Sequence, residues 1–181
     1  MIDTGIIENF IKGDLDNFPE IVDSLSPFAF STALRMLGDE DEADDIVQES
    51  MITVWQKIGR LKNPEGFKSW FYRIVINKCY DRLRRIKRNP ETCCDERIWG
   101  VLSDRITEDP SVSLENNEIC FIVNALTMKL SPKQKAVFVL SDLEEMSQEE
   151  ISSITGISRS SVKSNLHHAR KKIGEQLKKY M

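Results

Sequence analysis

Hydrophobic residues recur every three or four positions along most of this chain, which is the period of an amphipathic α-helix. This spacing predicts helices over residues 6–12, 24–37, 41–58 and 67–88, and again over residues 131–140, 147–155 and 158–177. For the second helix we expect Ser26 as the start, with Pro27 at the first helical position. The pattern therefore predicts an all-α fold, with a bundle of three or four helices in the first half.

Two of the later helices carry clear start and stop signals. Ser147 followed by Glu150 is a capping box, Gly156 suits a left-handed C-terminal cap, and Ser158 caps the next helix. Two short helices around a glycine turn, the second of them basic, are typical of a helix-turn-helix that enters a DNA groove. The pattern favours DNA binding over its alternative, a solvated basic helix on a small bundle.

The helix after Ser158 has one apolar and one basic face. The apolar stripe predicted to be buried consists of Val162, Leu166, Ala169, Ile173 and Leu177. The opposite face and its flanks carry Arg159, Ser160, Lys163, Ser164, His167, His168, Arg170 and Lys171. No acidic residue interrupts the sequence from Ser158 to Gly174, so this face is predicted to contact phosphate.

Asparagine, proline and glycine in residues 59–67 predict a polar loop before a helix that mixes aromatic and basic residues. Side chains available to phosphates and base edges are Lys68, Arg73, Asn77, Lys78, Arg82, Arg84 and Arg85, and the rings that offer stacking surfaces are Trp70, Phe71, Tyr72 and Tyr80. This mixture suits single-stranded nucleic acid, because bases stack on rings while cations follow the backbone. We expect Phe67 and Phe71 to be ordinary core residues. For Trp70 and Tyr72 both roles stay open.

The helix over residues 41–58 is amphipathic and acidic. Its apolar face holds Ala43, Ile46, Val47, Ser50, Met51, Val54, Trp55 and Ile58, and its polar face holds Asp41, Asp44, Asp45, Gln48 and Glu49. Such a face predicts a basic protein partner. The alternative, a metal-binding carboxylate cluster of a nuclease, is less favoured because acidic runs on helices are usually solvated or protein-facing.

Charge is unevenly distributed along the 181 residues, although the net charge is only −4. Residues 1–56 contain 2 basic and 13 acidic residues, residues 57–90 contain 11 and 2, residues 91–128 contain 2 and 8, and residues 129–181 contain 10 and 6. Residues 89–113 lack a helical period, are polar and acidic, and include Pro90 and Pro110. We therefore expect two small helical domains, residues 1–88 and 114–181, joined by an acidic, extended and flexible linker over residues 89–113.

Several classes of protein are disfavoured. No apolar run has the roughly 18 residues of a membrane span, and the first ten residues lack the basic start of a signal peptide, so we expect a cytoplasmic protein. The cysteines, Cys79, Cys93, Cys94 and Cys120, lack zinc-ligand spacing. With no phosphate-binding loop and no nucleophile beside a base, we expect no metal, no cofactor, no small-molecule substrate and no enzymatic activity.

Three segments together resemble a known family. They are DEADDIVQESMITVW, FKSWFYRIVINKCYDRLRR, and LSPKQKAVFVLSDLEEMSQEEISSITGISRSSVKSNLHHARKK, and they resemble regions two and four of extracytoplasmic-function (ECF) sigma factors, the small two-domain branch of the sigma-70 family. The resemblance implies an all-helical chain that binds core RNA polymerase, directs it to promoters and helps to melt them, commonly under the control of an anti-sigma factor. The alternative is a dimeric helix-turn-helix regulator of duplex operators, which has no use for the acidic helix or the aromatic basic one.

The resemblance also implies roles for individual positions. The surface for core polymerase corresponds to Asp44, Asp45, Val47, Gln48 and Glu49. With the basic face described above, the site for the minus-ten element and its unpaired strand consists of Lys62, Asn63, Trp70, Arg73, Asn77, Lys78, Arg82 and Arg85. The minus-thirty-five site consists of Arg159, Ser160, Ser161, Lys163, Ser164, His167, His168, Arg170 and Lys171.

Overall fold

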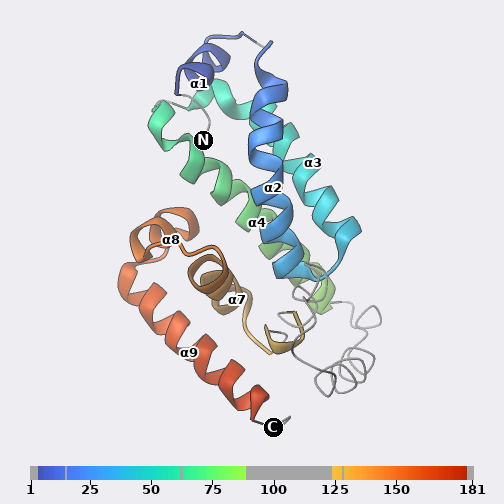
Figure 1. Ribbon diagram of the computed structural model, residues 1–181, viewed down its shortest axis with the longest axis vertical. Coiled ribbons are helices and arrows are strands. Elements are labelled where there is room, and N and C mark those ends of the chain that lie inside the picture. Colours follow the sequence, from blue (N-terminus) through green and yellow to red (C-terminus); the bar gives the residue numbers. More distant parts are fainter. Residues whose placement is uncertain (1–3, 15, 62, 89–123, 128, 179–181) are drawn as a thin grey trace, which may run out of the picture.

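The computed structural model describes residues 4–14, 16–61, 63–88, 124–127 and 129–178, and these residues form helices and turns without a strand. The first half contains α1 (Thr4–Ile11), α2 (Phe18–Leu37), α3 (Glu40–Lys57) and α4 (Phe67–Arg88) (Figure 1). Two short 3₁₀ turns, Ile58–Arg60 and Pro64–Gly66, lie between α3 and α4. The predicted all-α fold is confirmed.

Helices α2, α3 and α4 pack against one another, and with α1 they form what we call the N-terminal lobe (Figure 1). Large side chains from every helix of this lobe are fully buried, among them Phe10, Ile21, Met36, Ile46, Val54, Phe71 and Ile76. At one end the ring of Phe10 lies 5.3 Å from that of Phe18 and 6.0 Å from that of Trp55, measured between centroids. Buried aliphatic and aromatic area of this kind is the main favourable contribution to such a small bundle.

The second half, which we call the C-terminal lobe, contains a helical turn at residues 124–127, α7 (Pro132–Phe138), a π-helical turn (Val139–Leu143), α8 (Gln148–Thr155) and α9 (Arg159–Leu177). Ser131 and Ser147 form capping boxes with Gln134 and Glu150. Gly156 ends α8 in the left-handed conformation (φ 72°), as predicted. The Ser158 hydroxyl then accepts a hydrogen bond from the backbone N–H of Ser161.

Three expectations about single positions are wrong. Helix α2 begins at Phe18 rather than Ser26, so Pro27 lies inside it. Burial of Ile21 and Ala29 on either side of the proline outweighs the lost backbone hydrogen bond. Leu177, assigned to the buried stripe of α9, and Trp55, assigned to the apolar face of α3, are 41% and 46% exposed, because each lies at the end of its helix, where fewer neighbours cover it.

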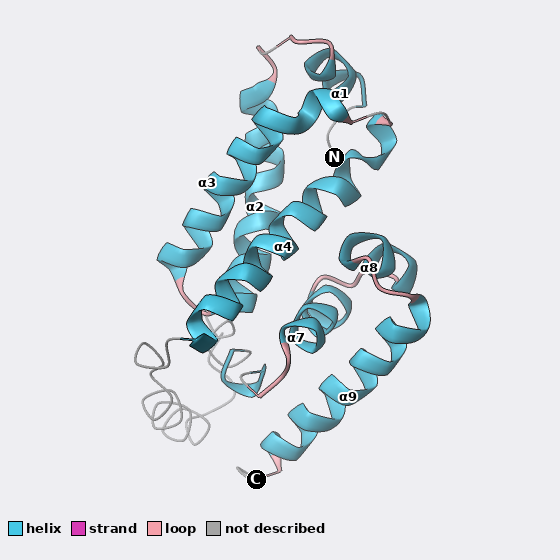
Figure 2. Ribbon diagram, turned by 180° about the vertical axis from the view of Figure 1, so that it is seen from behind, coloured by secondary structure: helices cyan, strands magenta, loops and turns pink. Residues whose placement is uncertain are grey.

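The two lobes lie against each other. Helix α4 contacts both α7 and α8, and α2 contacts the π-helical turn (Figure 2). Buried residues of the two lobes, such as Val75 and Ile76 on α4 and Ile151 and Ile154 on α8, belong to one continuous apolar cluster. The predicted linker, residues 89–113, and the start of the second predicted domain lie outside the described residues.

Candidate functional site

The outward face of α3 is acidic at one end and apolar at the other. Asp39 caps the helix by accepting a hydrogen bond of 2.9 Å from the N–H of Glu42. The predicted polymerase-binding residues Asp44, Asp45, Gln48 and Glu49 are exposed, and Val47 is half-buried beside them. Ile52 and Trp55 continue the face, with exposures of 56% and 46%. Ile52 was not among the predicted contact residues, although its position four residues after Gln48 places it on the polar face.

Ion pairs join α3 to α4. The Lys78 ammonium lies 3.0 Å from a Glu49 carboxylate oxygen. The Arg82 guanidinium contacts Glu42 and also approaches Glu49 at 3.3 Å. Two residues assigned to the minus-ten site therefore lie at the edge of α4 that faces α3, where carboxylates already balance their charge. Sequence spacing could not reveal this, because the partners are about thirty to forty positions apart in the chain.

The remaining minus-ten candidates lie on the turn before α4 and along α4 itself. The Asn63 side chain accepts a hydrogen bond of 3.0 Å from the N–H of Glu65, which shapes this turn. Arg73, Asn77 and Arg85 are exposed, and the Arg73 guanidinium donates to the backbone carbonyl of Ser153. Lys62 lies outside the described residues.

Burial separates the rings of α4 that belong to the core from those that could stack on a base, and the expected core positions of Phe67 and Phe71 are confirmed. Phe71, Tyr72 and Tyr80 are buried, and Trp70 is half-buried with its ring 5.9 Å from that of Phe67. The Tyr72 ring stacks on Phe28 at 3.5 Å. Burial, helped by the nearby carboxylates of the C-terminal lobe, raises the pKa of Tyr72 to about 12. Of these rings, Trp70 alone keeps part of its surface open to a base.

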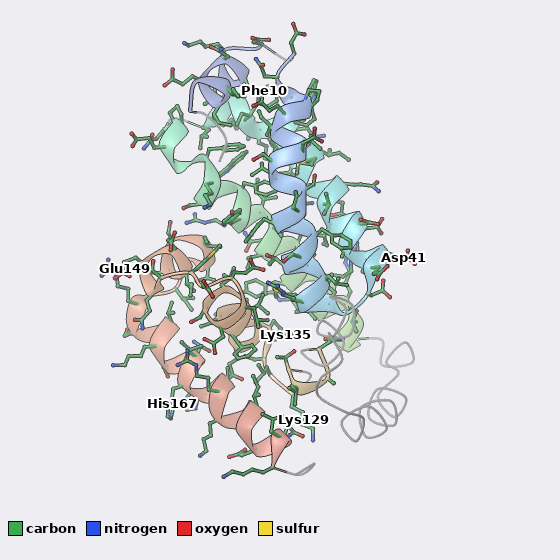
Figure 3. All side chains as sticks on the ribbon, viewed as in Figure 1. Phe10, Asp41, Lys129, Lys135, Glu149 and His167 are labelled. Carbon is green, nitrogen blue, oxygen red and sulfur yellow. The ribbon has the colours of Figure 1, made fainter. Side chains whose placement is uncertain are left out.

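The minus-thirty-five candidates share one face of α9, from which His167 points outward (Figure 3). Ser161 is half-buried at the helix start, and the other eight are exposed. A groove of about 510 Å³ runs beside this face and is lined by Gln148, Lys163, Leu166, His167, Arg170 and Lys171. Arg170 donates two hydrogen bonds, of 2.6 and 2.9 Å, to the carboxylate of Asp142, and this pairing raises its pKa. Its guanidinium is therefore held in one orientation.

The described residues contain no group of three or more histidine, cysteine or acidic side chains that could hold a metal ion. Cys79 is a buried free thiol, and burial raises its pKa to about 12. The other cysteines lie outside the described residues. Among the residues that the structure describes, no helix is both long and apolar enough to span a membrane.

Both lobes of the chain are similar in sequence to known protein families. The chain matches the family model of Sigma-70 region 2 over residues 21–89 and that of Sigma-70, region 4 over residues 121–173. It is 32% identical to the ECF RNA polymerase sigma factor SigW of Bacillus subtilis, across 95% of each chain. The chain belongs to the ECF family of RNA polymerase sigma factors. It is also 30% identical to the RNA polymerase sigma factor SigV of the same organism, across 83% of this chain and 84% of SigV.

Solved structures share the fold of this sigma factor. CnrH, in complex with the cytosolic domain of CnrY, superposes with a TM-score of 0.69 over 97% of both chains at 24% identity. RpoE of Bartonella quintana, in complex with the anti-sigma factor NepR, gives a TM-score of 0.63 over 90% of this chain and 97% of RpoE at 23% identity. As a member of the family, the protein is a transcription initiation factor that binds core RNA polymerase and directs it to promoters. Regions 2 and 4 correspond to the N-terminal and C-terminal lobes.

Proposed function

We propose that this sigma factor contacts polymerase and promoter through three separate surfaces. The acidic face of α3 binds core polymerase, the turn before α4 and the exposed side of α4 bind the unpaired minus-ten strand, and α9 binds the minus-thirty-five duplex. The observation that carries this proposal is the separation of charge, with carboxylates gathered on the outer face of α3 and cations on the outer face of α9. Opposite charges on separate surfaces suit a protein that joins a polymerase to DNA.

On α3 the proposed contact combines charge with apolar area. Asp44, Asp45 and Glu49 supply an acidic rim for a basic partner, Gln48 adds a neutral polar group, and Val47 adds apolar surface between them. The neighbouring Ile52 and Trp55 extend the contact, because partly exposed aromatic and aliphatic side chains are typical centres of protein interfaces.

On α4 the proposed role is to hold DNA that has left the duplex. Trp70 offers a ring to an extruded base, and Arg73, Asn77 and Arg85 follow the strand. Holding the base and strand offsets the free-energy cost of unstacking without any hydrolysis. Lys78 and Arg82 contribute less directly, because their ion pairs fix α4 against the polymerase-binding helix.

On α9 the proposed role is to bind a major groove. Lys163 and Lys171 neutralise phosphates, while Ser160, Ser164 and the two histidines face the base edges. Arg159 lies 2.7 Å from Glu149, and Arg170 is paired with Asp142, so the lysines are the cations most available to phosphate.

The partner polymerase supplies the polymerisation chemistry, and this chain contributes binding only, without a cofactor or a small-molecule substrate. NepR, which the RpoE structure contains, is an anti-sigma factor. We propose that a protein of the same class controls this chain. Because its partners are polymerase and chromosomal DNA, it acts in the cytoplasm.

Three variants test whether the three surfaces have separate binding roles. Gln48→Ala on α3 should weaken binding to core polymerase, Trp70→Ala should slow open-complex formation by assembled holoenzyme, and Lys163→Ala should weaken binding to minus-thirty-five duplex. Each variant is measured for its affinity for core polymerase, for promoter melting by permanganate footprinting, and for its affinity for the minus-thirty-five duplex. The proposal fails if each variant impairs all three activities equally, or if core binding is lost in Trp70→Ala and kept in Gln48→Ala.

A further inference from the structure

One arginine on the DNA-facing side of α9 is held by a carboxylate through two hydrogen bonds. Arg170 donates from Nε to one carboxylate oxygen of Asp142 at 2.9 Å and from Nη2 to the other at 2.6 Å. The hydrogen bonding to Asp142 is the main cause of the raised pKa of Arg170. Two parallel charge-assisted hydrogen bonds fix the plane of a guanidinium as well as its position. Arg170 therefore differs from the lysines of this face, because an ammonium group has no plane to fix.

The pairing leaves the outer end of the guanidinium available. A guanidinium has five N–H donors, and Asp142 takes the Nε donor and one Nη2 donor. The remaining Nη2 donor and the neighbouring Nη1 donor form the end-on edge of the group. Two parallel donors of this kind match the O6 and N7 acceptors of guanine in a major groove. The Arg170 side chain is 59% exposed, so a ligand can reach the group.

Arg170 lies in the groove beside α9 together with other residues proposed to bind DNA. Lys163, His167 and Lys171 of α9 line this groove with it, and Gln148 of α8 contributes to the other wall. The α9 positions follow the helical period, so they share one side of the helix. Figure 3 shows His167 of this group pointing outward. An arginine fixed on this side meets the same ligand as the lysines do.

Asp142 is itself held in place by the fold. It lies in the π-helical turn Val139–Leu143, in which Val139 and Leu140 are fully buried. The N–H of Glu144 donates to the carbonyl of Val139 at 3.0 Å, which is the wider hydrogen-bonded ring of a π-helix. The Asp142 side chain is only 20% exposed. A short, partly buried carboxylate on an anchored turn has little freedom to lose when it holds an arginine.

A second arginine of this surface has a weaker partner. The Nη1 of Arg159 lies 2.7 Å from a carboxylate oxygen of Glu149, and both side chains are more exposed than those of the Asp142–Arg170 pair. Exposed ion pairs contribute little to stability and exchange partners easily. Arg159 can therefore leave Glu149 for a phosphate, whereas Arg170 keeps its carboxylate when it meets DNA.

We propose that Asp142 determines sequence specificity at the minus-thirty-five element by positioning Arg170 to read a guanine instead of clamping a phosphate. The inference rests on the proposed function of α9. The carboxylate has two effects. It fixes the free edge of the guanidinium toward the base edges, and its charge offsets the attraction of Arg170 for the phosphates of any sequence. Asp142 itself touches no base and is a positioning residue.

A promoter selection by assembled holoenzyme tests this assignment. Core polymerase with the unmodified chain or with Asp142→Asn selects duplexes from a pool that is randomised across both promoter elements. With Asp142→Asn, the enrichment of a guanine in the minus-thirty-five motif should fall by about tenfold. The minus-ten motif should stay unchanged, which shows that the variant is folded. The matched control is Glu145→Gln, which removes an exposed carboxylate three positions later and should keep both motifs.

A double-mutant cycle separates positioning from a structural role of the pair. Arg170→Gln alone should lose the same guanine preference, and adding Asp142→Asn to it should change the preference no further. Asp142→Glu keeps a carboxylate and should restore part of the preference. If Asp142→Asn lowers the preference of a chain that already lacks Arg170, the carboxylate acts through the fold and its positioning role is wrong.

Binding to a duplex of unrelated sequence gives a readout in the opposite direction. Asp142→Asn frees the charge of Arg170 for phosphate, so the affinity of the full chain for this duplex should rise and its salt dependence should steepen by about one counterion. A loss of structure would lower this affinity instead, and that result contradicts the proposal.

The selection also distinguishes this inference from the proposed function on which it rests. If the unmodified holoenzyme selects a minus-thirty-five motif that lacks guanine, or one that Asp142→Asn leaves unchanged, the role of Asp142 is wrong and α9 remains the duplex-binding helix. If the unmodified holoenzyme selects no minus-thirty-five motif, the proposed function of α9 is wrong and the inference fails with it.

Discussion

Replacing Lys135 by methionine removes a buried charge from the region where the lobes meet. Lys135 on α7 is only 4% exposed, and its ammonium donates to the side-chain oxygen of Asn124. Burial lowers its pKa from 10.5 to about 7, against a small opposing effect from the Cys79 thiol on α4. The folded chain therefore holds this proton less tightly than the unfolded chain does.

The sign of the pH dependence follows from that difference. Between the folded pKa of about 7 and the unfolded value of 10.5, the unfolded chain binds more protons at Lys135, so the free energy of unfolding rises with pH. Integrating over both proton equilibria gives a gain of about 2 kcal/mol between about pH 6.5 and pH 8.5. Below this window the lysine is charged in both states, and its burial destabilises the fold.

Urea unfolding followed by circular dichroism at several pH values measures this gain. The matched control is Lys133→Met, since Lys133 is an exposed lysine on the same helix. The unmodified chain and Lys133→Met should gain the same stability across the window, and Lys135→Met should gain about 2 kcal/mol less. If Lys135→Met keeps the full gain, the stability change comes from other groups and the assigned burial of the ammonium is wrong.

Three further outcomes are expected. Phe71→Ala should lower the free energy of unfolding by about 3–5 kcal/mol, measured by urea denaturation, because the ring is fully buried; a loss under 1 kcal/mol would contradict its place in the core. Lys163→Ala should reduce the salt dependence of minus-thirty-five duplex binding by about one counterion, whereas Lys133→Ala should not; equal slopes would remove Lys163 from the phosphate contacts. Trp70→Ala should impair promoter opening more than polymerase binding, which is measured as the number of open complexes formed per bound holoenzyme. If polymerase binding is impaired more than promoter opening, the ring is not part of the strand site.

Local signals in the sequence were sufficient for much of the fold. Capping boxes at Ser131 and Ser147 and the left-handed Gly156 depend on residues within a few positions of each other, so their boundaries were predictable. Long-range packing was not predictable from these local signals. Pro27 lies inside α2 because residues on both sides of it are buried by other helices, a fact that no local pattern contains.

The candidate surfaces were predictable as helix faces but not as contacts. Periodicity placed the candidate residues of α9 and α3 on outward faces. In the structure nearly all of them are exposed on those faces. It did not reveal that Arg82 is paired across to α3, that Tyr72 is buried and stacks on Phe28, or that Arg73 reaches Ser153. These contacts join residues at least thirty positions apart, and only the packing of the lobes determines them.

Run-off transcription with purified core polymerase, with and without this chain, tests the central claim most directly. The templates are a promoter library from the genome that encodes the chain. The account predicts specific start sites that appear only with the chain and that share one minus-ten and one minus-thirty-five element. It is contradicted if core polymerase neither binds the chain nor gains start sites, while the chain alone binds duplex DNA as a regulator would.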